Sequence, residues 1–383
     1  MSGFFFETVR SVLCEAGAVK KLGESARSLG MTRVFFVTDP GVYKAGLTQS
    51  AEQSLRNVGV EVVMYHDVQA DPPETVVLAA VERAKAEKID GVIGLGGGSS
   101  MDVAKLIAVL AISVQPLKEM YGINNVKGER LPLIQIPTTA GTGSEVTPIS
   151  IITTGETTKL GVVSKQLLPD LAILDAELTL GLPPAVTAAT GIDAMVHAIE
   201  AFTTKHKKNP YSDMLAKQAL QLMSANLYKA VHDGKNLPAR EAMLIGAMMA
   251  GQAFANAPVA AVHAMAYPLG GHYHIPHGLS NSLVLPPVLR FNASHAAPLY
   301  AELLPYLGAT PSGHVGKDCD AFITQMEKLI DDVALPKRLR DLQVPENDLP
   351  MLAADVMLQQ RLLINNPREL VEADALAIYR EVY

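Results

Sequence analysis

In the N-terminal part of this chain, short β-branched runs alternate with helical patterns, and few folds are compatible with this alternation. Apolar runs at residues 34–38 and 60–65 flank a helical pattern over 44–57, and another helical pattern over 73–87 leads into an apolar run at 91–95. Strands that alternate with helices pair in parallel, because each helix carries the chain back along the sheet. A strand at 131–136 and a β-ribbon from 150–153 and 160–163 complete the predicted α/β part.

The pattern changes after residue 180 to long segments rich in alanine, leucine and methionine. Helical periodicity predicts helices over residues 186–203, 212–231, 239–255 and 296–307. A chain of 383 residues is too long for one ordinary hydrophobic core. We therefore predict an α/β dinucleotide-binding domain over residues 1–180 and an all-helical, metal-binding catalytic domain over 181–383, with the active site between them.

Composition excludes several classes of function. Hydrophobic residues make up 49% and charged residues 19%, as in a well-packed enzyme. The longest apolar stretches, such as residues 106–114, reach about half of the ~20 residues of a membrane span. A net charge of −7 and scattered basic residues argue against nucleic-acid binding. Two cysteines are too few for a disulfide framework. With no export signal at the N-terminus, we expect a cytoplasmic protein that binds neither membrane nor nucleic acid.

A glycine-rich turn follows the apolar run at 91–95 and opens the next helix. Gly97, Gly98 and Ser99 lie where backbone N–H groups and the helix N-terminus can hold a pyrophosphate. Asp102, in the helix that follows, joins these residues as a cofactor-binding candidate. The turn is not the Gly-x-Gly-x-x-Gly fingerprint, and it follows the third predicted strand where that fingerprint follows the first. A simple tight turn is the alternative.

Two further loops favour a dinucleotide. Asp39 ends the strand at 34–38, where a carboxylate can accept hydrogen bonds from ribose hydroxyls and repel the 2′-phosphate of NADP. The alternative for Asp39 is a turn-starting role before Pro-Gly. The loop at 137–145 is dense in hydroxyls and glycines and can donate several hydrogen bonds to phosphate or amide groups, although alone it is merely a polar loop.

Histidines gather in the helical half. Asp193 and His197 are four residues apart and share a helix face, although such a pair commonly makes only a local hydrogen bond. Four of the ten histidines fall within residues 263–277. His263 and His277 can converge on one ion across a Pro/Gly-rich bend, so the four residues would supply three nitrogens and one oxygen. That donor set suits iron(II) or zinc(II).

The motifs follow one another along the chain in the order GGGSSMDVAK, PTTAGTGSEVT, the helix with Asp193 and His197, and the segment 263–277. Together they resemble the iron-containing (group III) alcohol dehydrogenase family over nearly the whole chain. The resemblance implies a dehydroquinate-synthase-like fold and an NAD-dependent, metal-dependent alcohol dehydrogenase. Iron(II) is the expected metal and zinc(II) the alternative. Hydride would pass between NAD and a small primary alcohol or hydroxy acid and its aldehyde. The implied ligands are Asp193, His197, His263 and His277, with Asp39 at the adenosine ribose and Gly97, Gly98, Ser99, Thr138, Thr139 and Ser144 around the rest of NAD.

One residue departs from the family pattern. Many members have a histidine four residues after the first loop ligand, where this chain has Tyr267. As a catalytic candidate, the phenol of Tyr267 donates a hydrogen bond well but is a poor base near neutral pH, so His272, His274 or water would substitute in the proton route. The alternative for His272 and His274 is a pair of loop residues that orient the neighbouring backbone. The alternative functions are a lyase related to dehydroquinate synthase and a catalytically idle nucleotide-binding relative. We expect a homo-oligomer, a dimer or larger.

Overall fold

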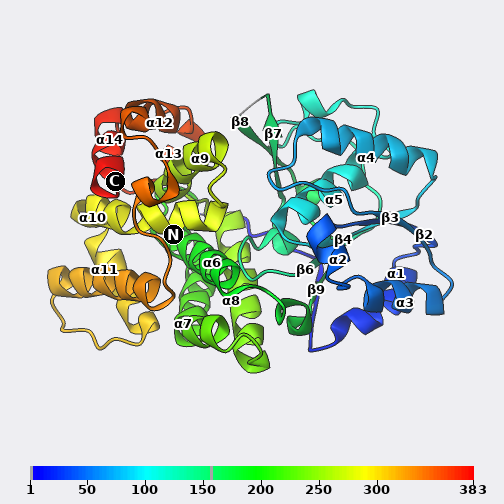
Figure 1. The fold of residues 1–383 in the computed structure, drawn as a ribbon, viewed down its shortest axis with the longest axis horizontal. Helices are drawn as coiled ribbons and strands as arrows, with labels where there is room; N and C mark the ends of the chain where they lie inside the picture. Colours follow the sequence, from blue (N-terminus) through cyan, green and yellow to red (C-terminus); the bar gives the residue numbers. More distant parts are fainter. Residues whose placement is uncertain (1–2, 156–157) are drawn as a thin grey trace. The chain divides into compact units, whose positions relative to one another are not determined.

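The computed structural model describes residues 3–155 and 158–383, which form two compact units (Figure 1). The α/β unit comprises Glu7–Thr139 and Gly143–Leu180. The helical unit comprises Gly181–Tyr383, the short segment Ala140–Thr142 and the N-terminal residues 3–6. The predicted fold class, an α/β part followed by a helical part, is therefore confirmed.

A six-stranded parallel sheet forms the centre of the α/β unit, in the order β1-β9-β6-β4-β2-β3. Its strands are β1 (Ser11–Cys14), β2 (Arg33–Val37), β3 (Glu61–Tyr65), β4 (Gly91–Gly96), β6 (Leu133–Pro137) and β9 (Leu171–Leu174). The predicted strands at 34–38, 60–65, 91–95 and 131–136 correspond to β2, β3, β4 and β6. Because β1 precedes them all, the glycine turn follows the fourth strand of the chain and not the third as predicted.

Helices cover both faces of this sheet, and β2 shows why its strands read as continuous apolar runs. Phe35 and Val37 pack on the face covered by α4 (Glu74–Ala86) and α5 (Gly98–Leu110). Val34 and Phe36 pack on the opposite face against α1 (Leu22–Ser28) and α3 (Gln49–Asn57), as Figure 1 shows. Both side-chain directions of a two-sided strand are buried, so both must be apolar.

The strand order contains a reversal that matters for function. From β2 the chain moves to β3 on one side, and it then returns past β2 to place β4, β6 and β9 on the other side. In doubly wound sheets of this order, ligands bind outside the carboxyl ends of the two strands at the reversal. Here those strands are β2, followed by Asp39, and β4, followed by the glycine turn.

A smaller three-stranded sheet, β5-β8-β7, joins the same unit. Its strands are β5 (Gly122–Ile123), β7 (Ile149–Thr154) and β8 (Thr158–Val163), and β7 pairs with β8 in antiparallel fashion, as the predicted ribbon requires. The predicted helix over 44–57 is wrong in its first part. Gly46 adopts φ +74°, which ends the short helix α2 (Pro40–Lys44) before α3 begins.

Among its described residues, the helical unit contains nine α-helices. They are α6 (Pro184–Thr203), α7 (Pro210–His232), α8 (Leu237–Asn256), α9 (Ala261–Tyr273), α10 (His277–Leu303), α11 (Val315–Asp332), α12 (Leu349–Val356), α13 (Gln360–Leu363) and α14 (Glu372–Glu381). The segment predicted as helical over 296–307 is helical, but it is not an element of its own. Its first part is the end of α10, and residues from Leu304 onward form a short 3-10 helix.

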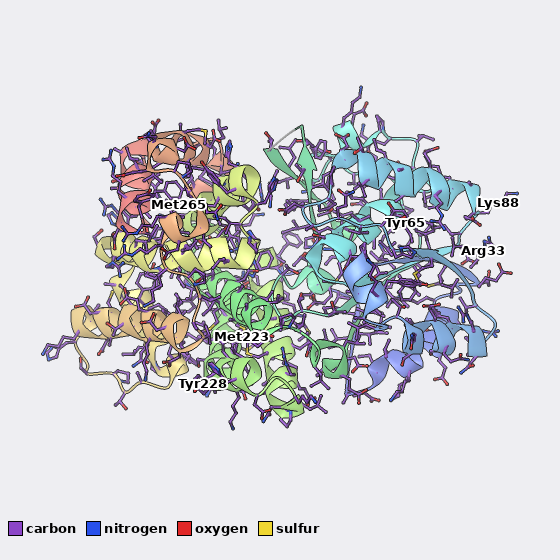
Figure 2. The ribbon with its side chains drawn as sticks, in the orientation of Figure 1. Arg33, Tyr65, Lys88, Met223, Tyr228 and Met265 are labelled. Carbon is purple, nitrogen blue, oxygen red and sulfur yellow. The ribbon has the colours of Figure 1, made fainter. Side chains whose placement is uncertain are left out.

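Side chains such as Met223 and Met265 fill the interior of this unit, where each is fully buried (Figure 2). Among the described residues, no single helix is long and apolar enough to cross a membrane. Only α8 and α9 taken together would pass by length and composition, and their axes differ by 105°.

Candidate functional site

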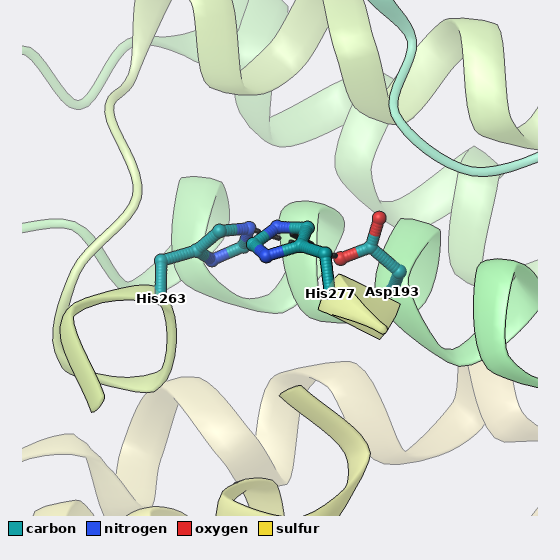
Figure 3. A group of neighbouring side chains, drawn as sticks. All are labelled: Asp193, His263 and His277. Carbon is teal, nitrogen blue, oxygen red and sulfur yellow. Dashed lines mark ion pairs between the residues drawn. The ribbon is translucent and has the colours of Figure 1, made fainter. Parts of the chain in front are cut away.

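Three side chains from three helices of the helical unit bring ligand atoms within 4.8 Å of one another (Figure 3). We call Asp193, His263 and His277 the Asp–His–His group. Oδ1 of Asp193 lies 3.6 Å from Nε2 of His277 and 3.9 Å from Nε2 of His263. Neighbouring ligands of a tetrahedral ion with bonds of about 2.1 Å are about 3.4 Å apart. The spacing and the N/O donor set therefore fit a divalent metal.

The helices converge here for a local reason. Asp193 lies in the middle of α6, and His277 begins α10, directly before Gly278. A Cβ on Gly278 would stand 2.3 Å from the carbonyl oxygen of Ala189 and 3.3 Å from Cβ of Asp193. Only glycine allows α10 to start this close to α6, and that approach brings His277 to Asp193.

Burial differs within the group. The side chains of Asp193 and His263 are 2% and 3% exposed, whereas that of His277 is 30% exposed. Burial alone would raise the pKa of Asp193, but His197, His277, His263 and the amide of Asn281 together hold it below its ordinary value. Asp193 is therefore an anion at neutral pH and ready to accept a cation.

His197, the fourth predicted ligand, lies beside this group but not within it. Its ring stacks on Phe254 at 4.3 Å between centroids and lies 4.6 Å from the ring of His263. Burial lowers the pKa of His197 to about 3, against the opposing pull of Asp193, so its imidazole is neutral. The Gly141 backbone also acts on this pKa, yet Nδ1 is buried and makes no hydrogen bond of normal geometry within the described residues.

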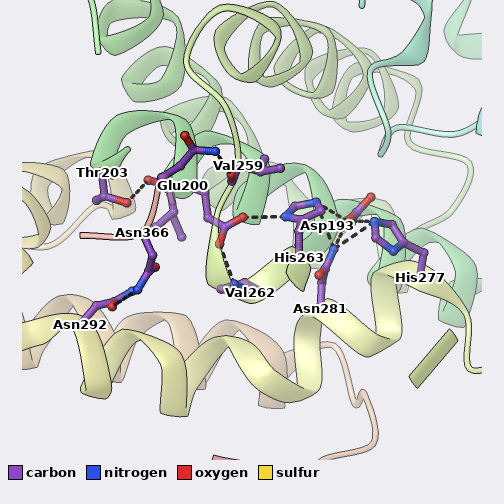
Figure 4. A network of polar contacts seen from close by, with 12 residues as sticks. Asp193, Glu200, Thr203, Val259, Val262, His263, His277, Asn281, Asn292 and Asn366 are labelled. Atoms are coloured by element: carbon purple, nitrogen blue, oxygen red, sulfur yellow. Dashed lines mark hydrogen bonds and ion pairs between the residues drawn. The ribbon is translucent and has the colours of Figure 1, made fainter. Parts of the chain in front are cut away.

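Two further polar residues, for which the sequence predicted no role, complete the surroundings. Glu200 on α6 and Asn281 on α10 both contact the Asp–His–His group (Figure 4). Nδ2 of Asn281 donates to Oδ1 of Asp193 at 2.6 Å and lies 3.3–3.4 Å from Nε2 of His277 and His263. The sequence signal that could have identified them is their spacing from the ligand candidates. Glu200 follows Asp193 by seven residues, and Asn281 follows His277 by four.

Tyr267 lies one helical turn after His263 on α9. Its ring centroid is 5.9 Å from that of His277, the most exposed member of the Asp–His–His group. Tyr267 is itself half-buried. The structure therefore places the phenol next to the more open side of the group.

The structure brings several nucleotide candidates together at the reversal of strand order. Gly97 precedes α5, whose N-terminus receives no side-chain cap. A Cβ on Gly97 would lie 3.9 Å from the side chain of Thr139, and the N–H of Thr138 donates to the carbonyl of Gly96. Gly98 and Ser99 form the first turn of α5, so their N–H groups join an open helix N-terminus at the strand ends.

Asp39 has two sets of partners at the same edge. Oδ1 accepts hydrogen bonds from the N–H groups of Gly41 and Val42, which caps α2. Oδ2 accepts from the hydroxyl of Ser100 at 3.3 Å. The turn-starting role considered for Asp39 is thus real, and its second oxygen still faces the glycine turn.

Asp102 and Ser144, two other cofactor candidates, form internal contacts with a buried lysine. The hydroxyl of Ser144 donates to Oδ1 of Asp102 at 2.6 Å and accepts from Nζ of Lys105 at 2.7 Å. Lys105 also donates to Oγ1 of Thr147 and to the carbonyl of Ile149. We call Lys105, Asp102, Ser144 and Thr147 the lysine network. It fastens the loop after β6 to α5 from the inside.

Comparisons with known proteins cover the whole chain. The sequence profile described as "Iron-containing alcohol dehydrogenase" matches residues 10–176. The profile described as "Fe-containing alcohol dehydrogenase family, C-terminal" matches residues 187–383. The chain is 42% identical over 371 residues to long-chain-alcohol dehydrogenase 1 of Geobacillus thermodenitrificans, spanning 96% of this chain and 93% of that protein.

Other relatives carry related names. The chain is 37% identical to 1,3-propanediol dehydrogenase of Klebsiella pneumoniae, spanning 96% and 95% of the two chains. Among solved structures, an alcohol dehydrogenase from Oenococcus oeni superposes with a TM-score of 0.96 at 34% identity, covering 100% of both chains. Both the sequence and the fold are thus similar to these dehydrogenases along their full length.

Proposed function

The chain is a member of the iron-containing alcohol dehydrogenase family, and we propose that it transfers hydride between NAD(H) and a small substrate. The reduced form of this substrate is a primary alcohol or hydroxy acid, and its oxidised form is the aldehyde. The observation that carries this proposal is the convergence of Asp193, His263 and His277 within 4.8 Å in the helical unit. We also propose that residues 1–180 and 181–383 are the nucleotide-binding and metal-binding domains.

We assign the metal to Asp193, His197, His263 and His277. Asp193 is ionised and His197 is neutral, which are the states that ligands require. These donors hold no thiolate, so they suit a catalytic ion, with iron(II) as our first choice and zinc(II) as the alternative. When bound, the ion supplies Lewis-acid activation of the substrate oxygen.

We assign NAD to the edge of the sheet where β2 and β4 end. Gly97, Gly98 and Ser99 offer an uncapped helix N-terminus to the pyrophosphate, and Thr138 and Thr139 adjoin them. Oδ2 of Asp39 is oriented toward the glycine turn and favours a ribose with free hydroxyls over a phosphorylated one. Asp102 and Ser144 contribute by fixing the loop through Lys105.

Tyr267 is our candidate for contact with the substrate. Its ring lies beside His277, on the more exposed side of the Asp–His–His group. A phenol is protonated at neutral pH, so Tyr267 would orient the substrate oxygen by donating a hydrogen bond. Proton removal then falls to water or to another imidazole.

We propose a primary alcohol as the substrate class because relatives bear names such as long-chain-alcohol, 1,3-propanediol and NAD-dependent methanol dehydrogenase. A homo-oligomer of two or more chains and a cytoplasmic location complete the proposal. Light scattering on the purified protein would test the first of these two points.

The test is the rate of NADH formation with a panel of short and long alcohols and hydroxy acids. The protein is stripped by a chelator and reloaded with iron(II) or zinc(II). Activity should vanish on stripping, return with metal and be lost in His277→Ala. His295→Ala removes an exposed histidine from the same helix α10 and should leave activity unchanged. Tight NAD binding without turnover on any alcohol would refute the proposal.

A further inference from the structure

Glu200 is a buried carboxylate that lies directly behind one member of the Asp–His–His group. Its side chain is 5% exposed. Oε2 lies 2.6 Å from Nδ1 of His263, and Oε1 accepts a hydrogen bond from the N–H of Val262 at 2.7 Å (Figure 4). Each carboxylate oxygen therefore has a partner at the start of α9.

The contact with Glu200 determines which nitrogen of His263 carries the proton. A carboxylate only accepts hydrogen bonds, so Nδ1 of His263 must be the donor. In a neutral imidazole the other nitrogen, Nε2, then carries a lone pair. Nε2 is the atom that lies 3.9 Å from Oδ1 of Asp193, on the side where the ligand atoms converge.

Helix geometry explains how one element controls both sides of this imidazole. Asp193 and Glu200 are seven residues apart on α6, which is close to two helical turns, so both carboxylates project from the same face. The ring of His263 lies between them, with Nδ1 on Glu200 and Nε2 toward Asp193. Both the tautomer and the orientation of the ring are thus set from α6.

We propose that Glu200 is a positioning residue that fixes His263 in the tautomer and orientation needed to bind the metal through Nε2. This inference rests on the proposed metal-dependent function. An anion behind a ligating imidazole also makes its outer nitrogen a stronger donor, and loss of such a partner typically weakens metal affinity by about 10–100-fold.

The substitution Glu200→Gln separates this role from a purely structural one. Glutamine has the same shape, but its amide nitrogen cannot accept a hydrogen bond. If the amide oxygen turns to Val262, the NH2 group faces Nδ1 of His263 and imposes the opposite tautomer. If the oxygen turns to His263, the N–H of Val262 meets another donor. Either orientation removes the negative charge from behind the ring.

The experiment measures zinc(II) and cobalt(II) affinity by chelator competition, together with the thermal midpoint of the metal-stripped protein. We expect Glu200→Gln to bind either metal about 10–100-fold more weakly, with an altered cobalt(II) visible spectrum. The thermal midpoints of the stripped proteins show whether a loss of stability accompanies the loss of metal affinity. Imidazole ¹⁵N shifts should report a protonated Nδ1 for His263 in the stripped parent.

A matched control comes from a buried polar pair elsewhere in the same unit. The amides of Asn292 and Asn366 exchange hydrogen bonds of 3.0 and 2.7 Å. Asn366→Ala should lower the thermal midpoint without changing metal affinity. If Glu200→Gln behaves like this control, the positioning role is wrong and Glu200 is structural. If His263→Ala binds metal as tightly as the parent does, the metal assignment of the proposed function fails as well.

Discussion

The two units each bury a cluster of charged and polar side chains, and the clusters differ in how completely their atoms are paired. In the α/β unit, Nζ of Lys105 has three hydrogen-bond acceptors and a carboxylate 3.7 Å away, all within the lysine network and β7. In the helical unit, Oδ1 of Asp193 and two imidazole nitrogens face one another. Nδ1 of His197 and Oδ1 of Asn281, both buried, make no hydrogen bond within the described residues.

This difference shows what each cluster is built for. Buried polar groups are normally satisfied, and an unsatisfied one costs about 1–3 kcal/mol. The polar atoms of the lysine network are hydrogen-bonded within the α/β unit, so the network holds a loop in place. The Asp–His–His group brings three potential ligand atoms within 4.8 Å of one another, with unpaired buried atoms on His197 and Asn281 beside them, which supports the proposal that it binds a cation. Removing a residue should therefore cost stability in the first cluster and chemistry in the second.

The largest expected effect is on the Asp–His–His group. His263→Ala removes a proposed ligand, and loss of several kcal/mol of Lewis-acid stabilisation corresponds to a fall of at least about 10³-fold in kcat/KM. The measurement is NADH formation alongside metal content per chain. NAD affinity should stay within about twofold, because the glycine turn belongs to the other unit. Full activity with normal metal content would show that His263 does not hold the metal.

The second prediction concerns the lysine network. Lys105→Met leaves the carboxylate of Asp102 buried without its cation, and breaking such a pair costs about 3–5 kcal/mol. Chemical denaturation should show this loss together with weaker NAD binding, while metal affinity remains unchanged. Lys85→Met, on the surface of α4 beside Glu82, should change stability by less than about 0.5 kcal/mol. If Lys105→Met weakened metal binding as much as NAD binding, the two clusters would not have the separate roles described above.

The pH dependence of stability provides a further test in the α/β unit through Glu145, which lies next to Ser144. Burial raises the pKa of Glu145 from 4.5 to about 7, against the opposing pull of Lys105. The folded protein therefore holds this proton more tightly than the unfolded chain does, so stability from this group is lost as pH rises from 4.5 to about 7.

Glu145→Gln removes this titration. Its thermal midpoint, compared with that of the parent, should be progressively higher from pH 5 to pH 8, by the equivalent of about 1–3 kcal/mol. A difference that stays constant over this range would show that the Glu145 carboxyl is not held protonated by its surroundings.

The smallest expected effect tests the two roles of Asp39. Asparagine caps helices as well as aspartate does, so Asp39→Asn should leave the thermal midpoint unchanged. It should lower KM for NADP by roughly fivefold, equivalent to about 1 kcal/mol, because the repelling charge is gone. Asp39→Ala also loses the cap and should cost about 1 kcal/mol of stability. If Asp39→Asn discriminates against NADP as strongly as the parent does, the residue is only a cap.

The sequence predicted the parts of this fold that depend on local pattern. β2 is apolar throughout because both faces of its strand are buried, and α6 to α8 follow simple helical periodicity. β1 (Ser11–Cys14) was missed because it is short and mostly exposed. Its partner β9 lies near the other end of the unit in the sequence. Local pattern carries no information about such a partner.

The same limit applies to the long helix and to the site. α10 contains Pro286, Pro287 and Pro298, which read as breaks in a sequence, yet the helix continues through all three. Asp193 and the histidines were identified because their chemical types stand out. Glu200 was not, since its role depends on how α6 packs against α9, which its position on α6 alone does not reveal.

The segment Ala140–Thr142 clusters with the helical unit although the residues on either side of it belong to the α/β unit. A Cβ on Gly141 would stand 2.8 Å from Cβ of Thr190, so this short segment is fitted closely to α6. A chimaera that joins the first half of one family member to the second half of another at residue 180 would inherit this segment from the wrong parent. Domain exchange between relatives should therefore succeed more often when residues 140–142 are transplanted with the helices than when a single crossover is used.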